Sequence, residues 1–264
     1  MKSGNRIRFI KKKSGYKHIN RLKEALSMFY LTSALKKFNI HASDGEMGKV
    51  KDLYFDDNKW AIRYAVVDTR KWLPGRRVLL SPTSFLTLNE ADNFLEIKYD
   101  KETVKSSPSI PDESIITKDV ENSLVGYYGW TQYWTGNMLW GPNDYPLEQF
   151  KKHENVQLRE EPIDSGLDYE LRSENETLGF KVHANDGKIG TVADMVYDDE
   201  NWKLRYIIVQ SSESLTAEKY YLFETSAIES ADWFEKDIYI KASLAEVKAK
   251  KLYTEKDKIL MDLS

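Results

Sequence analysis

Hydrophobic and polar residues alternate along two stretches of the chain, residues 60–67 and residues 202–209. In each stretch every second side chain is aromatic or aliphatic: Trp60, Ile62, Tyr64 and Val66, then Trp202, Leu204, Tyr206 and Ile208. A period of two residues predicts β-strands that turn one face toward a core. We therefore expect Trp60 and Trp202 to occupy equivalent buried positions.

The two stretches belong to a longer repeat. Residues 41–57 return as residues 183–199, at an offset of 142 and with many identical positions. The offset extends to residues 80–84 and 222–226 and has shifted by one at Ile97. Solenoid repeats recur every 20 to 50 residues or so, and a spacing this long therefore indicates two duplicated domains.

Turn residues recur at matching places in both copies. Asp-Gly pairs at residues 44–45 and 186–187, flanked by apolar segments, are typical of tight hairpins. Three residues after each turn glycine, Gly48 and Gly190 stand where a strand is expected to bulge or bend. The residues expected to form the repeated structural core are Gly45, Gly48, Trp60, Tyr64, Gly187, Gly190, Trp202 and Tyr206.

Further short strands complete the pattern of a small antiparallel barrel. They are predicted at residues 78–80, 94–99, 220–223 and 238–240. Ser243 and Glu246 have capping-box spacing, which predicts a short helix that closes the second copy.

The chain therefore divides into five parts. They are a basic N-terminal arm at residues 1–34, helical or disordered; a first barrel at 35–105; a connecting segment at 106–176; a second barrel with its closing helix at 177–250; and a tail at 251–264. We predict an all-β protein of two small barrels with short helices, related by a pseudo-twofold axis. Domains of roughly 70 residues bury only a small core, so packing between the copies or against another protein is expected.

Charge is distributed unevenly. Residues 1–37 hold eleven Lys or Arg and one acidic residue, Glu24, whereas the rest of the chain is acidic. The arm also has apolar residues at helical spacing between Ile19 and Phe29. A basic amphipathic helix binds anionic membrane surfaces or nucleic acid, and the acidic remainder would not. The alternative interpretation is an upstream extension, with the ordered domain beginning near Met28.

The composition also predicts the cellular compartment of the protein. The chain has no cysteine, which excludes disulfides and thiolate sites within it. No apolar run approaches the roughly 20 residues that span a bilayer, and no secretory signal follows the basic N-terminus. We expect a soluble, cytoplasmic protein.

The connecting segment is rich in glycine and aromatic residues. The side chains that make it a candidate interface are Tyr127, Tyr128, Trp130, Tyr133, Trp134, Trp140 and Tyr145. Large, stiff aromatic side chains dominate interface energetics. We expect the segment either to pack back between the barrels or to form an exposed contact site, which includes the alternative of self-association.

The ordered set H-A-x-D-G-x-x-G-x-V-x-D, followed by D-D-x-x-W-x-x-R-Y-x-x-V, resembles the PRC-barrel family. That family includes the cytoplasmic domain of the photosynthetic reaction-centre H subunit and the C-terminal domain of a ribosome-maturation factor. The resemblance covers residues 35–105 and 177–250 and extends to stand-alone bacterial members. It implies barrels used for assembly and protein contacts, without catalysis. The chain lacks the H subunit's transmembrane helix and the ribosome factor's N-terminal domain.

Candidate chemical groups have simpler structural explanations. Carboxylates, which are the ligands that hard cations prefer, recur in both copies. They are Asp44, Asp52, Asp56 and Asp57, with Asp186, Asp194, Asp198 and Asp199. Their spacing does not match an EF-hand loop and is typical of hairpin turns. His41 and His183 each stand alone at a strand end. Arg63 and Arg205 are expected to pair with a local carboxylate such as Asp52 or Asp194. We predict no catalytic residues, cofactor or metal site.

These observations favour a non-enzymatic assembly or adaptor protein that binds an unidentified protein partner. The alternative is peripheral attachment to an anionic membrane surface or to nucleic acid through the basic arm.

Overall fold

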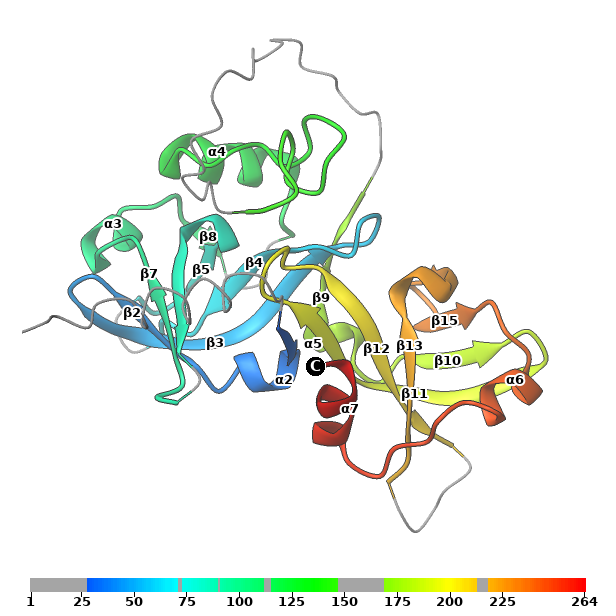
Figure 1. The fold of residues 1–264 in the computed structure, drawn as a ribbon. Helices are drawn as coiled ribbons and strands as arrows, with labels where there is room; N and C mark the ends of the chain where they lie inside the picture. The colour runs from blue at the N-terminus through cyan, green and yellow to red at the C-terminus, as the bar shows by residue number, and fades with distance from the viewer. Residues whose placement is uncertain (1–27, 71–72, 90, 112–114, 147–168, 213–217) are drawn as a thin grey trace, which may run out of the picture.

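The computed structural model describes residues 28–70, 73–89, 91–111, 115–146, 169–212 and 218–264. Strands dominate and the helices are short, which confirms the prediction of a β-rich chain. The strands form two sheets, in which the long strands β3 (Gly45–Asp56) and β11 (Gly187–Asp198) curve across each sheet (Figure 1). Among the described residues, no helix is long and apolar enough to cross a bilayer.

The first sheet has the strand order β6-β7-β2-β3-β4-β5-β8, with β9 paired to β3 beside this path. Strands β2 and β7 pair in parallel, and the other neighbours pair antiparallel. The remaining bounds are β2 (Asn39–Ala42), β4 (Ile62–Val67), β5 (Arg76–Leu80), β6 (Phe85–Asn89), β7 (Phe94–Ile97) and β8 (Ile110–Pro111), with the short helices η1 (Pro82–Ser84) and α3 (Lys101–Lys105).

The second sheet has the order β13-β12-β11-β10-β15-β14, with β1 paired to β11. Its elements are β10 (Lys181–Ala184), β12 (Leu204–Ser211), β13 (Tyr220–Glu224), β14 (Ile228–Asp232), β15 (Asp237–Ile240), η2 (Thr225–Ala227), α6 (Leu244–Lys248) and α7 (Lys256–Leu263). The predicted capping box is confirmed, because Ser243 and Glu246 each accept a backbone N–H from the other at the start of α6. Within the described residues, no strand pairing joins the two ends of either sheet.

The two sheets match element by element, with one correction to the sequence alignment. Ala65 pairs with Leu80 in the first sheet, and its counterpart Ile207 pairs with Phe223 in the second. Leu80 therefore corresponds to Phe223, at an offset of 143. The shift of one residue lies between the β4/β12 and β5/β13 pairs, earlier than the sequence placed it.

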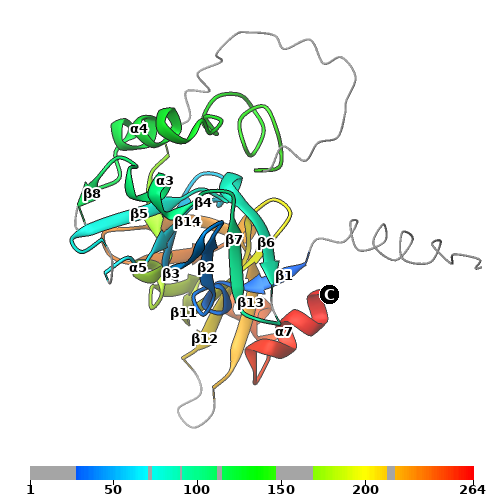
Figure 2. The same cartoon turned by 90° about the vertical axis from the view of Figure 1, so that its left-hand side faces the viewer.

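Each copy lends its first strand to the other copy's sheet. Strand β1 (Phe29–Leu31) pairs with β11, and its counterpart β9 (Leu171–Ser173) pairs with β3. The helices that follow, α2 (Thr32–Leu35) and α5 (Glu174–Thr177), also correspond. The sequence placed residues 29–34 in the arm and 171–176 in the connecting segment. Figures 1 and 2 show instead that β1 runs beside the second sheet.

Carboxylates hold the exchanged segments in place. Asp194 accepts hydrogen bonds from Ser33 Oγ (2.6 Å) and Thr32 Oγ1 (3.0 Å). Its counterpart Asp52 accepts from Ser173 Oγ (2.6 Å) and from the Asn175 backbone N–H (3.0 Å). The expected pairing of these carboxylates with Arg63 and Arg205 is therefore wrong, since both are occupied by the exchanged segments.

The copies meet where a residue pairs with its own counterpart. Ala61 and Lys203, 142 positions apart, form an antiparallel bridge in which Ile62 N–H donates to Trp202 O (2.8 Å) and Leu204 N–H donates to Trp60 O (2.7 Å). Pairing of equivalent residues is what a twofold relation between the copies requires.

The tryptophans lie beside this junction. Trp60 and Trp202 are buried, as predicted, and stack on Phe55 and Tyr197 with ring centroids 5.2 and 5.1 Å apart. Both have positive φ (57° and 55°) and precede the strand rather than starting it. Strand β4 is buried on both faces, so the expected half-buried pattern is wrong there. The second face is covered by the connecting segment.

The predicted bend at the paired glycines is confirmed. The β2–β3 register slips between Ile40, which pairs with Gly48, and His41, which pairs with Glu46. Gly48 has φ 149°, and a Cβ there would lie 2.2 Å from the Asp68 carbonyl oxygen. Any larger residue would push this backbone contact apart.

Candidate binding site

The connecting segment folds back over the first sheet. Helix α4 (Lys118–Tyr128) starts at the Thr117 cap and ends at Gly129, which has φ 68°. Figures 1 and 2 both show α4 and the loop after it lying across one end of the first sheet. The segment thus covers the outer face of β4, which carries Arg63.

Residues 118–146, called the cover below, enclose Arg63 almost fully. Its side chain is 1% exposed, and its Nε donates to Asp56 Oδ2 at 2.7 Å. The guanidinium lies 4.0 Å from the ring centre of Tyr133 and 4.7 Å from that of Trp140. The predicted local ion pair therefore exists, but with Asp56. The aromatic rings supply cation–π contacts to a desolvated charge.

A buried carboxylate fastens the cover to the neighbouring tyrosine. Glu121 accepts hydrogen bonds from the hydroxyls of Tyr64 (3.0 Å), Tyr169 (3.1 Å) and Tyr133. Burial, with the nearby Glu121 charge, raises the pKa of Tyr64 and of Tyr133 well above the usual value. These hydroxyls therefore remain donors to Glu121 at neutral pH.

The cover also contacts the turns before β4 and β12. Lys59 Nζ, in the first copy, donates to Met138 O at 2.6 Å, and Trp140 Nε1 donates to Asn201 O of the second copy at 2.7 Å. Of the aromatic side chains singled out in the sequence, Tyr128, Trp130, Tyr133 and Trp140 are buried, Trp134 is half-buried, and Tyr127 and Tyr145 are exposed. The buried ones pack against the chain itself.

The equivalent face of the second copy is open. Arg205 donates through Nε to Asp198 Oδ2 (2.5 Å), as Arg63 does to Asp56, but its side chain is 38% exposed. Its neighbour Tyr206 is half-buried and meets Phe29 of β1 edge-on. In the part of the chain that the structure describes, no aromatic ring stacks on Arg205.

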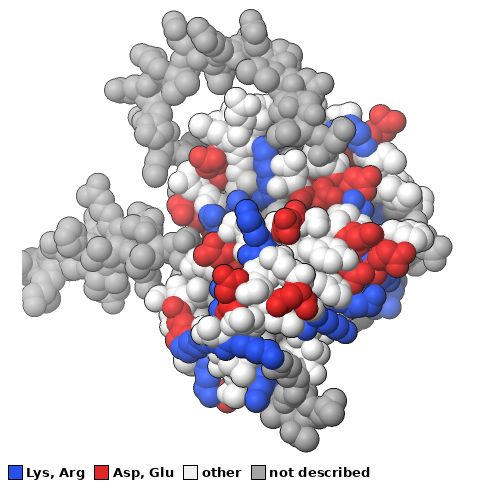
Figure 3. Space-filling model, turned by 90° about the vertical axis from the view of Figure 1, so that its right-hand side faces the viewer, with Lys and Arg blue, Asp and Glu red and all other residues white. Residues whose placement is uncertain are grey.

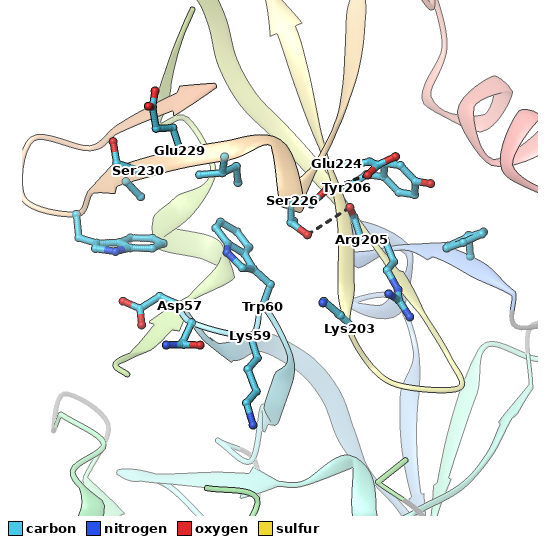
Figure 4. A pocket seen from close by; sticks show the side chains of 16 residues that line it. Asp57, Lys59, Trp60, Lys203, Arg205, Tyr206, Glu224, Ser226, Glu229 and Ser230 are labelled. Carbon is cyan, nitrogen blue, oxygen red and sulfur yellow. Dashed lines mark hydrogen bonds between the residues drawn. The ribbon is translucent and has the colours of Figure 1, made fainter. Parts of the chain in front are cut away.

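A cavity of about 660 Å³ lies at this open face (Figure 4). Its walls come from both copies and from the exchanged strand: Phe29, residues 57–60, Lys203, residues 205–206, residues 224–226, residues 228–231 and Trp233. Figure 4 shows Lys203 and Arg205 on one side of it, and Glu229 and Ser230 on another. The cavity occupies the position in the second copy that corresponds to the covered Arg63 face in the first.

Positive charge collects on the Arg205 side of the cavity. Lys203 stands where the first copy has Ala61. Burial and the Arg205 charge lower its pKa, and burial and the Arg63 charge lower the pKa of Lys59. The acidic Asp57 is already engaged by Arg172 (2.8 Å). A carboxylate from a ligand would relieve this excess of positive charge.

The repeated aspartates have structural partners. Asp44 and Asp186 accept the backbone N–H groups of Lys101 (3.0 Å) and Leu244 (2.6 Å), the first residues of α3 and α6. Asp199 accepts the Met28 N–H at 2.9 Å. Among the described residues, no group of three His, Asp or Glu side chains is placed to hold a metal ion.

The two histidines lie at corresponding strand positions. His41 stacks on Phe94 with ring centroids 4.8 Å apart. His183 stacks on Tyr239, and its Nε2 lies 2.8 Å from Asp237 Oδ1. Both contacts tie β2 and β10 to their parallel neighbours, β7 and β15.

Sequence reasoning missed the cavity. Phe29 falls in the predicted arm, Trp233 lies outside the repeated motif, and Lys203 lies within the predicted strand at residues 202–209 without a role of its own. One signal was available: the aligned repeats differ in charge at Ala61 and Lys203 while both keep the following Arg-Tyr pair.

The chain matches no protein-family model and no curated protein.

Proposed function

We propose that the chain is a non-enzymatic assembly protein that binds a polypeptide partner in the cavity beside Arg205. One observation carries the proposal: of two corresponding Arg-Tyr faces, the first is covered by a segment of the chain and the second is open. The cover over the first face, which is itself polypeptide, supports a polypeptide ligand for the second.

The lining of the cavity supports a protein ligand. Arg, Trp and Tyr are the residues most enriched at the centres of protein interfaces. The open face combines Arg205 and Tyr206 with Trp60 and Trp233, whose rings lie 6.4 Å apart. Aromatic walls that also carry charges of both signs suit the side chains of a partner better than a polymer whose charges all have one sign.

We further interpret the two curled sheets as tandem PRC-type barrels related by a pseudo-twofold axis. The repeated H-A-x-D-G motif and the element-by-element correspondence of the sheets support this interpretation. The family resemblance in turn favours assembly over catalysis, although fold likeness is only an analogy for function.

The alternative proposal is attachment to an anionic membrane or nucleic acid through the basic arm. Its support is the charge of residues 1–27, which lie outside the described residues. The described face of the second copy does not add to it, because Lys and Arg are interspersed there with Asp and Glu (Figure 3). Binding through the arm should weaken steeply with salt, whereas binding in the cavity should not.

Site-specific cross-linking tests the main proposal. The full chain carrying a photoreactive benzoylphenylalanine at Ser226, an exposed residue of the cavity wall, is irradiated in an extract of its native cell. A matched chain carries the same group at Ser123, an exposed residue of α4 outside the cavity.

We expect one polypeptide to be joined through position 226 and not through position 123, and the purified partner to form a complex of fixed stoichiometry with the unmodified chain. If both positions capture the same mixture, or if the purified candidate does not bind, the proposed function is wrong.

A further inference from the structure

The contacts that cover the first copy indicate what the open cavity of the second copy would bind. Over Arg63 the chain places the rings of Tyr133 and Trp140, both within 5 Å of the guanidinium carbon. The counterpart Arg205 is held by the same kind of aspartate bond, at 2.5 Å, lines the cavity and is 38% exposed. An arginine fixed in this way is a ready platform for an aromatic ring.

We propose that the cavity binds a partner segment that stacks a Trp or Tyr ring on Arg205 and directs a carboxylate to Lys203. This inference rests on the proposed function and specifies the chemistry of the partner. The aromatic element follows from the covered face. The carboxylate follows from the difference between the two faces, which is that the open face has Lys203 where the covered face has Ala61.

That difference is a gain of positive charge. In the first copy the residue two positions before the arginine is Ala61, which contributes no charge. In the second copy it is Lys203, and no carboxylate among the described residues lies within ion-pairing distance of its Nζ. A partner carboxylate would complete a pair in a partly desolvated place, where an ion pair is stronger than on an open surface.

The rest of the wall argues against a phosphate ligand as the main occupant. Glu224 of β13 pairs with Tyr206 of β12, and Glu229 lies on another side of the cavity. Ser226 Oγ already donates to Glu224 at 2.8 Å. One carboxylate can reach Lys203 while an aromatic ring stacks on Arg205, but a row of phosphates would meet both glutamates.

Random dodecapeptides displayed on phage provide the test, selected against the full chain. Synthetic copies of the enriched peptides are then titrated by fluorescence anisotropy. We expect the enriched peptides to carry Trp or Tyr with a nearby Asp or Glu. Replacing the aromatic residue by Ala, or the acid by its amide, should weaken each by about tenfold.

Two variants of the chain place the binding in the cavity. Ser226→Trp fills the cavity from an exposed position, and Lys203→Gln removes the positive charge without disturbing the Arg205–Asp198 pair. Each should weaken peptide binding by about tenfold. Ser123→Trp, the control, should bind as the unmodified chain does. Circular dichroism and the thermal midpoint establish that the variants are folded.

The inference is overturned if no peptide is enriched, if the enriched peptides lack aromatic residues, or if Ser226→Trp binds them unchanged. Its failure can be told from failure of the proposed function. A partner cross-linked at position 226 through a segment with neither aromatic nor acidic residues overturns only this inference, whereas absence of any such partner overturns the proposed function.

Discussion

Arg63 and Arg205 occupy corresponding places in two copies of one motif, yet one side chain is 1% exposed and the other 38%. Both follow a buried tryptophan by three residues, and both donate through Nε to the aspartate that ends the preceding long strand. The motif therefore specifies the strand, the turn and the ion pair. What lies over the arginine is decided by another part of the chain.

The difference shows how a duplicated fold can separate structure from binding. In the first copy residues 118–146 extend the core over the arginine face, and Glu121 holds them there through three tyrosines. In the second copy the same face keeps its arginine and remains accessible beside a cavity. Substitutions that act equally on both copies test the shared part, and those that act unequally test the cover.

The largest effects are expected at the tryptophans shared by both copies. Trp60→Ala and Trp202→Ala should each lower the free energy of unfolding by about 3 to 5 kcal/mol, because each side chain is enclosed beside an aromatic neighbour. Urea denaturation followed by circular dichroism measures both. An unchanged midpoint in either variant would contradict the equivalence of the two positions.

Replacing the two arginines by alanine should lower the free energy of unfolding by unequal amounts. Arg63→Ala leaves Asp56 buried without its partner and opens a space between Tyr133 and Trp140, which should cost about 3 to 5 kcal/mol. Arg205→Ala also leaves a buried aspartate, Asp198, without its partner, but the Arg205 side chain is partly solvated and no ring among the described residues packs on it, so the cost should be smaller, about 1 to 3 kcal/mol. Equal losses in urea denaturation would mean that the cover contributes little to the first face.

How much of this was predictable depends on whether a contact is local. The hairpins, the glycine bends at Gly48 and Gly190 and the capping box at Ser243 follow from residues within a few positions of each other, and they were predicted correctly. The exchange of β1 and β9 was not, since three-residue strands carry no periodic signal and their partners lie more than 100 residues away.

The ion pairs and the cavity show the same limit. Asp52 and Asp56 look alike in sequence, and only the exchanged strand decides that Asp52 binds Ser173 while Asp56 is left for Arg63. The cavity combines Phe29, Trp60 and Trp233, which come from three separate regions of the chain. No spacing rule joins such residues before the fold is known.

Replacement of Glu121, the carboxylate that holds the cover, should have an intermediate effect on the free energy of unfolding. Glu121→Gln keeps the size of the side chain but removes the charge that strengthens three hydrogen bonds, and it should cost about 1 to 3 kcal/mol. Glu229→Gln, at an exposed position of the cavity wall, is the control and should leave the free energy of unfolding nearly unchanged. If Glu121→Gln lowers the free energy of unfolding as little as Glu229→Gln does, the tyrosines hold the cover without the Glu121 charge.

The smallest expected effect is a difference between the two faces in the pH at which a tyrosine ionises. Burial, with the Glu121 charge, raises the pKa of Tyr64 well above its usual value, and burial, with the Glu224 charge, raises that of Tyr206. A tyrosine is neutral when protonated, so the unfolded chain loses these protons first, near pH 10. The stability due to the protonated tyrosines is complete below that pH and is lost as the pH rises through the folded-state pKa values.

Absorbance titration near 295 nm should therefore show Tyr64 ionising only as the chain unfolds, while Tyr206, which is half-buried, ionises earlier. Tyr64→Phe and Tyr206→Phe assign the two steps. Tyr64→Phe should remove part of the late absorbance change, which accompanies unfolding, and Tyr206→Phe part of the earlier one. If Tyr64 instead titrates before the chain unfolds, water reaches Glu121 and its tyrosines, and the cover over the first face opens without loss of the sheets beneath it.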